Sequence, residues 1–385
     1  MSRSSRMCSA AGPPTPRGSA CEDPCRRRRG TGEPFRIAEL DLDEPRADEI
    51  LVRIKAVGLC HTDLTVASML PAEMFPRVFG HEGAGVVEAV GSDITGVKAG
   101  DHVVMSFRSC RDCGHCSDGD FGYCENAMVL NNMGYRADGS TTYSRDGQPV
   151  AGSFFGQSSF SELAIGYADN VVVVDPSTDL TLAAPFGCGF LTGAGAVLNT
   201  IDPEPGSSLL VSGVGAVGLA AVAAARALGL ETVVAVDTQD SRLEQAAALG
   251  AHVINPTTLP EVGGVEKIRE LTGGGATAAV DTTAVPQVIK QGVQALAARG
   301  RMVVVGLGAS EFPVDSIDLL YNGKSVQGCI EGDADPQTLI PRLLEMRAAG
   351  DLPLDELVTT YPFEDINRAV EEVTAGTVVK PVLVF

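Results

Sequence analysis

The stretch "LLVSGVGAVGLAAVAAARALGL" at residues 209–230 contains Gly213, Gly215 and Gly218 in the spacing G-x-G-x-x-G. The spacing alone is a weak signal, because 44 of the 385 residues are glycine. Its surroundings strengthen it: a short apolar run precedes the glycines, an Ala-rich helical stretch follows, and Asp237 ends the next apolar run, "TVVAVD". These features together predict a dinucleotide-binding βαβ unit, with the pyrophosphate at the helix N-terminus. The alternative is that the glycines only tighten a βα turn.

The acidic residue of this unit predicts which coenzyme binds. Asp237 would accept hydrogen bonds from the adenosine ribose hydroxyls, and its charge would repel a 2′-phosphate. We therefore predict NAD rather than NADP. Arg242 is predicted to lie near the adenosine, although an exposed helix arginine is an equally good interpretation.

The wider pattern around the glycines predicts an α/β fold. Strand-like and helix-like runs alternate over residues 190–331, which predicts a doubly wound parallel sheet (Rossmann domain) covered by helices on both faces. Residues 35–189 instead show short β segments with glycine-rich turns, such as "EILVRIKAVG" at 49–58. Residues 332–385 return to that style. The coenzyme domain is therefore predicted to be inserted into a β-rich catalytic domain.

Composition excludes some classes of protein. The chain is 44% apolar and 20% charged, as in globular α/β proteins, and its formal net charge of −20 argues against nucleic-acid binding. No run of about 18 apolar residues suggests a membrane span. Residues 1–34 hold seven arginines, including "RRRR" at 26–29, without apolar periodicity. We expect a disordered or wrongly assigned extension there, with an import or polyanion patch as the alternative. Because that segment lacks a secretory signal, we expect a cytoplasmic protein with reduced thiols, including Cys8, Cys21 and Cys25.

The lobe at residues 108–126 carries "CRDCGHCSDGDFGYC", with Cys110, Cys113, Cys116 and Cys124. Disulfides, an iron–sulfur cluster and zinc are the candidates. Reduced thiols disfavour disulfides. In bacterial ferredoxins the fourth cysteine follows after three residues and precedes a proline, which is not the case here. A closed four-cysteine structural zinc site is therefore predicted, stabilising a lobe with little apolar surface.

Further potential metal ligands are dispersed in "GLCHTD" (58–63), "FGHEGAG" (79–85) and "PFGCGFLTG" (185–193). Taken singly, each is equally well explained as a buried thiol or core histidine. Together with the four-cysteine lobe and "GVGAVG", however, they occur in an order that resembles the zinc-dependent alcohol dehydrogenases of the medium-chain dehydrogenase/reductase family. The resemblance covers residues 35–385 and implies a GroES-like catalytic domain. "FFGQSSFSELA" and "LLEMRAAGDLPLDELVTTYPFEDINRAVEE" resemble the aryl-alcohol (benzyl-alcohol) dehydrogenase branch most closely.

The resemblance implies a catalytic zinc held by Cys60, His81 and Cys188, with a fourth position for alcohol or water. It implies that Glu82 lies close to the zinc and aids ligand exchange. Asp63 is expected to orient His81, or else to be an ordinary turn carboxylate.

Thr62 matches the family's hydroxyl that relays the alcohol proton. Three residues further on, where many members have a histidine, this chain has Thr65, so we expect water to carry the proton away.

Other family positions concern the coenzyme and the substrate. His61 and Lys380 match basic positions near the pyrophosphate, although Lys380 could also be a surface lysine. Thr192 and the backbone around Leu307 match positions near the nicotinamide. Three phenylalanines match pocket walls that favour aromatic or allylic alcohols, unless they are core residues: Phe107, Phe154 and Phe155. The family also implies a homodimer or homotetramer joined through the coenzyme domain.

These residues predict an oxidoreductase that uses two zinc ions and NAD to oxidise a primary alcohol reversibly. One alternative is a formaldehyde dehydrogenase or S-nitrosothiol reductase that acts on thiol adducts. Such anionic substrates would need a basic pocket rim, and the sequence shows no basic cluster after residue 34. Another is a non-catalytic zinc- and nucleotide-binding protein, which would not require the full set of Cys60, Thr62, His81 and Cys188.

Overall fold

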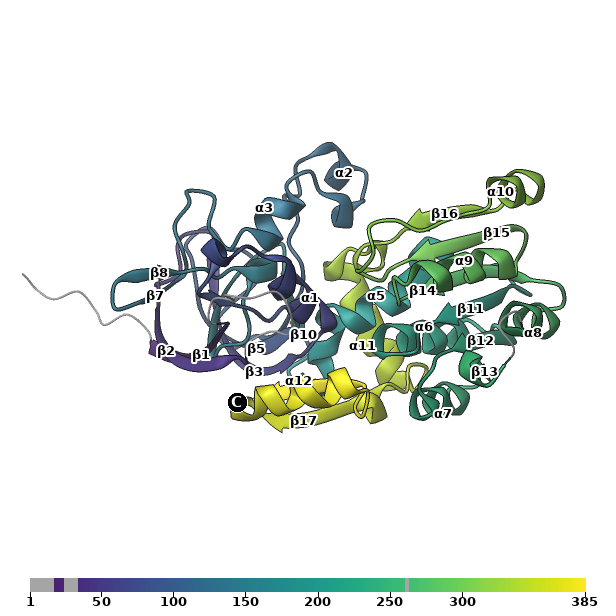
Figure 1. Ribbon diagram of the computed structural model, residues 1–385. Helices are drawn as coiled ribbons and strands as arrows, with labels where there is room; N and C mark the ends of the chain where they lie inside the picture. The colour runs from purple at the N-terminus through teal and green to yellow at the C-terminus, as the bar shows by residue number, and fades with distance from the viewer. Residues whose placement is uncertain (1–16, 24–33, 260–262) are drawn as a thin grey trace, which may run out of the picture.

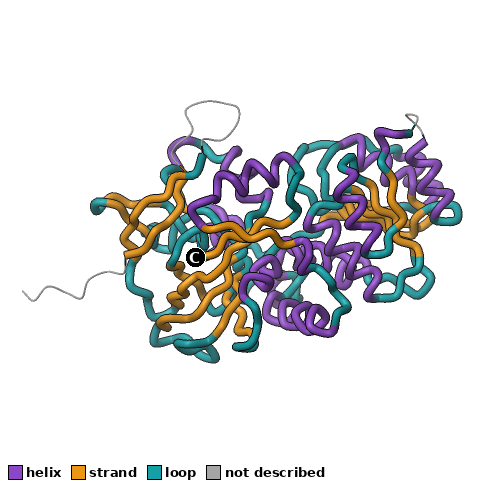
Figure 2. The backbone as a smooth tube through the Cα atoms, turned by 90° about the horizontal axis from the view of Figure 1, so that it is seen from below, coloured by secondary structure: helices purple, strands orange, loops and turns teal. Residues whose placement is uncertain are grey.

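The computed structural model describes residues 17–23, 34–259 and 263–385. A β-rich part lies at one end of the molecule and an α/β part at the other, with α5 and α11 between them (Figure 1). Figure 2 shows the strands gathered in two separate regions. The predicted fold class, a parallel-sheet coenzyme domain inserted into a β-rich domain, is confirmed.

The β-rich part is built around a seven-stranded sheet in the order β10-β6-β5-β3-β18-β17, with β9 also paired to β3. β18 comes from the C-terminus and pairs antiparallel with β3, so the last residues complete a domain that the first residues begin. The strands are β3 (Glu49–Gly58), β5 (Gly83–Val90), β6 (His102–Met105), β9 (Leu163–Tyr167), β10 (Val171–Val174), β17 (Val358–Pro362) and β18 (Lys380–Val384).

A second sheet, of five strands, has the order β4-β1-β2-β7-β8. Its strands are β1 (Arg17–Asp23), β2 (Arg36–Leu42), β4 (Arg77–Val78), β7 (Tyr143–Arg145) and β8 (Gln148–Val150). β1 lies in the segment that we expected to be disordered, and this expectation is wrong for residues 17–23. The strand is made by backbone pairing with β2 and by burial of Ala20, and neither leaves an apolar pattern in the sequence. Cys8, Cys25 and the four arginines at 26–29 lie outside the described residues.

The coenzyme domain has a six-stranded, fully parallel sheet in the order β13-β12-β11-β14-β15-β16. Its strands are β11 (Ser208–Ser212), β12 (Thr232–Val236), β13 (His252–Ile254), β14 (Ala276–Asp281), β15 (Leu296–Val304) and β16 (Ser325–Gly328). Its helices are α6 (Ala216–Ala227), α7 (Asp240–Ala248), α8 (Gly263–Leu271), α9 (Pro286–Ala295) and α10 (Ser316–Asn322).

Alternate side chains of β11 show that helices cover both faces of this sheet. Leu209 and Val211 belong to the core cluster that contains Leu219 of α6. Leu210 belongs to a different cluster, with Ile268 of α8 and residues of α9. A strand buried on both faces is uniformly apolar, which explains why "SLLV" carries no alternation.

The remaining α-helices are α1 (His61–Met69), α2 (Gly114–Ser117), α3 (Ala127–Asn132), α4 (Leu180–Ala183), α5 (Gly189–Gly195), α11 (Pro336–Ala349) and α12 (Ile366–Ala375). One core cluster contains both Phe190 of α5 and Leu343 of α11. Within the described chain, no single helix is long and apolar enough to cross a membrane. One bent pair, Leu180–Gly187 with Gly189–Ile201, passes that test by length and composition only.

Candidate active site

Four side chains from distant parts of the sequence meet beside α5. The ligand atoms of Cys60, His81, Glu82 and Cys188 all lie within 4.8 Å of one another. Cys60 directly precedes α1, His81 and Glu82 directly precede β5, and Cys188 directly precedes α5. His81, Glu82 and Cys188 are buried, and Cys60 is partly buried. The structure thus brings together all three residues predicted to bind the catalytic zinc.

Asp63 holds two of these residues in place. One carboxylate oxygen lies 2.9 Å from Nδ1 of His81 and accepts a hydrogen bond from the Gly80 N–H. The other accepts from the backbone N–H of Cys60 at 3.1 Å. Asp63 is fully buried. Its two oxygens therefore hold both the His81 ring and the start of α1 in fixed positions.

The donor set fits a zinc ion. With Nδ1 of His81 facing Asp63, its buried Nε2 has no hydrogen-bond partner among the described residues. A buried ring nitrogen left unpaired is unfavourable unless something binds it. Two thiols and one imidazole form the ligand set of zinc sites that keep a position open for substrate.

Glu82 and Lys380 form a buried ion pair next to this cluster. Lys380 Nζ donates to Glu82 Oε1 at 2.6 Å, and the same oxygen accepts from the Gly189 N–H at 2.9 Å. Burial raises the pKa of Glu82 to about 7, although the charge of Lys380 opposes this. The Lys380 side chain is 2% exposed, so the alternative that it is a surface lysine is wrong. Its predicted role near the pyrophosphate stays a prediction.

Two polar side chains that were not predicted from the sequence, Gln157 and Ser106, also support the site. The Gln157 amide donates to the carbonyls of His81 and Ser106 and accepts from the Gly83 N–H. The Ser106 hydroxyl donates to the Gly187 carbonyl at 2.6 Å, next to Cys188. Gln157 lies in "FFGQSSFSELA", but no local pattern marks a buried amide that hydrogen-bonds distant backbone.

The three predicted pocket phenylalanines differ in position. Phe155 is partly exposed, and its ring centroid lies 4.6 Å from that of His81. Phe154 is fully buried and packs edge-on against His81 and Phe79. Phe107 is buried in a core cluster. Of the three phenylalanines, only Phe155 both contacts a residue of the metal-ligand cluster and is partly exposed.

The first turn of α1 carries the remaining predicted residues around Cys60. Thr62 is partly buried and stands two residues after Cys60, and Thr65 is partly buried one helical turn later. His61 is exposed. Their predicted roles in proton transfer and pyrophosphate binding stay predictions.

The glycine loop connects β11 to α6. Gly213 has a φ of +82°, and a Cβ at Gly218 would lie 2.0 Å from the Gly213 carbonyl oxygen, so both positions require glycine. A Cβ at Gly215 would instead meet no atom within 4 Å. Gly215 therefore leaves open space at the N-terminus of α6, which fits the close approach of a pyrophosphate.

Asp237 lies beside this loop, just after β12. Its carboxylate accepts hydrogen bonds from the N–H groups of Val214 at 2.8 Å and Gln239 at 2.9 Å. The Arg242 guanidinium lies 3.9 Å from it. The acidic group and the glycine loop are thus held together, as the sequence spacing predicted.

Thr192 of α5 donates a hydrogen bond to Glu331 at 3.3 Å. The Cys188 thiol donates to the same carboxylate at 3.5 Å. Burial raises the pKa of Glu331 to about 7. No local sequence pattern marks Glu331, although it follows the last strand of the coenzyme sheet. Leu307, predicted near the nicotinamide, is 54% exposed after β15.

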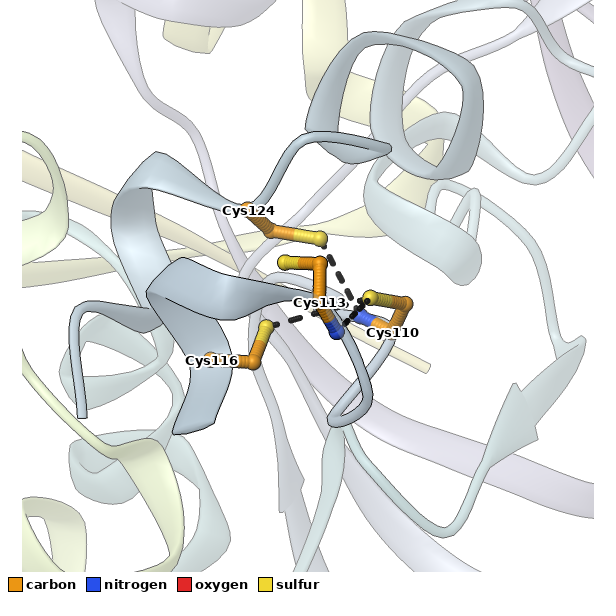
Figure 3. Close-up of side chains that lie close together, drawn as sticks. All are labelled: Cys110, Cys113, Cys116 and Cys124. Carbon is orange, nitrogen blue, oxygen red and sulfur yellow. Dashed lines mark hydrogen bonds between the residues drawn. The ribbon is translucent and has the colours of Figure 1, made fainter. Parts of the chain in front are cut away.

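The second metal-ligand cluster is the four-cysteine lobe. The sulfur atoms of Cys110, Cys113, Cys116 and Cys124 all lie within 4.8 Å of one another (Figure 3). The Cys110 and Cys116 sulfurs are 3.9 Å apart. This is close to the S···S edge of about 3.8 Å expected for a tetrahedral zinc site with Zn–S bonds of about 2.3 Å. The four thiols therefore have the arrangement of a closed zinc site.

The lobe is attached to the rest of the molecule by polar contacts. Arg111 pairs with Asp335 at 2.8 Å and stacks on Phe121. The Tyr123 hydroxyl donates to Asp333 at 2.8 Å. Because both acceptors lie just after β16, the lobe supports the turn that connects the two domains.

Replacing Cys113 with serine should remove the zinc of this lobe and lower Tm by at least about 5 °C, because structural zinc contributes folding free energy directly. The measurement combines calorimetry with metal analysis. Ser117→Ala, an exposed change in the same lobe, is the control and should melt like the wild type. Unchanged melting of Cys113→Ser together with abolished hydride transfer would contradict a structural role.

Comparison with known proteins agrees with this architecture. The alcohol dehydrogenase GroES-like domain family matches residues 46–176, and the zinc-binding dehydrogenase family matches residues 216–346. Geraniol dehydrogenase of Castellaniella defragrans is 42% identical over 361 residues, which are 93% of this chain and 96% of that protein.

Two solved structures are similar over nearly the whole chain. An alcohol dehydrogenase zinc-binding domain protein from Burkholderia ambifaria superposes with a TM-score of 0.91 at 42% identity. Benzyl alcohol dehydrogenase from Acinetobacter calcoaceticus superposes with a TM-score of 0.90 at 38% identity. Each comparison covers 96% of this chain and 99% of the other. The chain belongs to the zinc-dependent alcohol dehydrogenases of the medium-chain dehydrogenase/reductase family.

Proposed function

We propose that this enzyme oxidises a primary alcohol with an aryl or bulky allylic group to the aldehyde, reversibly, with transfer of the hydride to NAD. The observation that carries the proposal is the convergence of Cys60, His81 and Cys188 around an imidazole nitrogen that no other described residue hydrogen-bonds, next to a partly exposed phenylalanine ring. When bound there, zinc supplies Lewis acidity to the alcohol or aldehyde oxygen.

The protein residues would orient the reactants and move the proton. Asp63 keeps the His81 Nδ1 proton in place, so that Nε2 faces the cluster. The Thr62 hydroxyl receives the alcohol proton and passes it on. Since Thr65 has no basic group, water takes the proton at the end of this path. In the buried ion pair next to the metal-ligand cluster, the positive charge of Lys380 compensates the negative charge of Glu82.

The coenzyme proposal rests on the glycine loop and Asp237. The open space at Gly215 admits the pyrophosphate, and the Asp237 carboxylate is positioned to accept from the adenosine ribose. A 2′-phosphate placed there would meet this negative charge, which favours NAD over NADP.

Replacing Asp237 with asparagine should raise the ratio of kcat/KM for NADP to that for NAD by about 10- to 100-fold, because one like-charge contact is removed. Arg242, 3.9 Å away, then becomes available to the phosphate. The asparagine side chain still has an oxygen that can accept a hydrogen bond from the Val214 N–H. As a control, the melting temperature of the variant is compared with that of the wild type to show that the loop is intact. An unchanged coenzyme ratio in a folded variant would show that another residue reads the ribose.

The substrate proposal rests on Phe155 and on the relatives. An aromatic ring beside the metal-ligand cluster favours binding of substrates with planar apolar groups, through burial and offset stacking. The names of two similar proteins, a geraniol dehydrogenase and a benzyl alcohol dehydrogenase, point to allylic and aryl alcohols. Anionic thiol adducts would need free cations at the pocket rim, whereas Lys380 is paired with Glu82.

An initial-rate screen tests the proposal. Benzyl, cinnamyl, terpene and aliphatic alcohols and glutathione and mycothiol adducts are compared with NAD and with NADP. We expect the highest kcat/KM for aryl or allylic primary alcohols with NAD. Activity confined to thiol adducts would replace the proposed substrate class, and no turnover of any compound by protein with full zinc content would contradict a catalytic role.

We also propose that two copies associate through the edge of the coenzyme sheet. β16 is the last strand in that sheet, and the nearby residues Ile317, Leu320 and Tyr321 of α10 are 59%, 72% and 81% exposed. An unpaired edge with exposed apolar side chains is a typical subunit contact. The cytoplasmic location stays a prediction.

A further inference from the structure

Glu331 is neither a metal ligand nor part of the proton path, yet its backbone is strained. It begins a short 3₁₀ turn, Glu331–Asp333, three residues after β16, and has a φ of +51°. Asp333, at the end of the same turn, has a φ of +47°. For residues other than glycine this conformation costs about 1 kcal/mol or more and persists only where the surroundings impose it.

Contacts from two directions impose this conformation. Asn199 donates to the Gly332 carbonyl at 3.0 Å, and Thr200 donates to the Asp333 carboxylate at 2.7 Å. The Tyr123 hydroxyl of the four-cysteine lobe donates to the other Asp333 oxygen. The turn is therefore held from both sides, and its effect is to place the Glu331 carboxylate against Cys188 and Thr192.

This carboxylate has little to stabilise its charge. Its two contacts are long, at 3.5 Å and 3.3 Å, and the described residues give it no ion pair with a lysine or arginine. Glu82, by contrast, is paired with Lys380. A partly buried carboxylate without a cationic partner indicates that a cationic ligand binds against it.

The position of Glu331 indicates which ligand this is. β11, β14, β15 and β16 are parallel, so their carboxyl ends lie at the same edge of the sheet. The glycine loop follows the carboxyl end of β11, and Glu331 follows that of β16. A dinucleotide lies along this edge.

α5 carries Thr192 and follows Cys188. It packs against the first turn of α6, since a Cβ at Gly193 would lie 2.0 Å from the Val217 carbonyl oxygen. A coenzyme with its pyrophosphate at Gly215 would therefore have its nicotinamide end near Cys188 and Thr192. The nicotinamide ring is positively charged in NAD⁺ and neutral in NADH.

Zinc is the other cation expected nearby. Glu331, however, is not among the four side chains whose ligand atoms lie within 4.8 Å of one another. One carboxylate oxygen contacts the Cys188 thiol, and the other contacts Thr192, a side chain that is not a metal ligand. The nicotinamide is therefore the better match.

We propose that Glu331 is a coenzyme-binding residue whose carboxylate lies against the nicotinamide and favours its oxidised, positively charged form. The inference rests on the proposed NAD-dependent function. A charge that attracts NAD⁺ but not NADH lowers the affinity for NADH relative to NAD⁺. It thereby promotes release of the reduced coenzyme during alcohol oxidation.

The test measures dissociation constants of NAD⁺ and NADH by calorimetry on zinc-loaded wild type and Glu331→Gln. We expect the Kd of NAD⁺ to rise about tenfold and that of NADH to change less than about twofold, because only one ligand carries the charge. Glu331→Asp keeps the charge and should retain most of the preference. Glu331→Met, an apolar side chain of similar length, provides a second neutral variant if the glutamine variant does not fold.

Two further measurements separate the outcomes. Asp333→Asn alters the same turn and should weaken both coenzymes equally, if at all. Zinc analysis of Glu331→Gln should still find two ions per chain. Equal weakening of NAD⁺ and NADH in both neutral variants, or loss of a zinc ion from Glu331→Gln, would overturn the assignment of Glu331. Failure of the wild type to bind either coenzyme would instead overturn the proposed function.

Discussion

Replacing Cys60 with serine should lower kcat/KM at least about 10³-fold and remove one of the two zinc ions per chain. The change replaces one sulfur by oxygen, so volume and backbone are retained while a thiolate ligand is lost. Metal-supplied Lewis acidity contributes several kcal/mol to such reactions, and each 1.36 kcal/mol is a factor of about ten in rate. Initial-rate kinetics and metal analysis of the same preparation measure both effects.

Cys329 provides the matched control. It is buried, and its sulfur lies 3.2 Å from the Thr200 hydroxyl oxygen, but it belongs to neither metal-ligand cluster. Cys329→Ser should therefore retain both zinc ions. A Cys60→Ser enzyme with two zinc ions and nearly normal kcat/KM would show that Cys60 is not a metal ligand.

Replacing Thr62 with valine should lower kcat by about 10²- to 10⁴-fold, the range for losing a positioned proton-transfer group. Valine has nearly the same shape as threonine and lacks only the hydroxyl. Zinc content and melting temperature should stay at wild-type values, because Asp63 and the start of α1 are unaffected. Steady-state kinetics with benzyl alcohol and NAD provide the measurement.

Thr65→Val is the control, one helical turn further along α1. It should change kcat by less than about threefold, since no basic group at this position takes part in the proposed path. If the Thr65 variant lost activity and the Thr62 variant kept it, the assignment of the proton path would be wrong.

Short sequence spacings predicted the local parts of this molecule correctly. The glycine spacing and Asp237 belong to one βαβ unit, and the four cysteines lie within fifteen residues, so neighbouring positions in the chain decide both geometries. Cys60, His81 and Cys188 are far apart in the sequence. They were connected only through the resemblance to a family, because no local pattern specifies which loops meet in space.

The remaining features depend on tertiary contacts. Lys380 opens an apolar C-terminal strand, and only the position of Glu82 across the fold explains its burial. Phe154 and Phe155 are adjacent in sequence, yet one is in the core and the other partly exposed. Glu331 lies in a turn whose unusual φ is imposed by Asn199, Thr200 and Tyr123, all distant in the chain.

The most direct test of the account is a crystal structure of the zinc-loaded protein with anomalous data collected at the zinc absorption edge. We expect two anomalous peaks per chain: one inside the four-cysteine lobe, and one bonded to the sulfurs of Cys60 and Cys188 at about 2.3 Å and to Nε2 of His81 at about 2.0–2.1 Å. A single peak, in the lobe alone, from protein that still oxidises alcohols would contradict it.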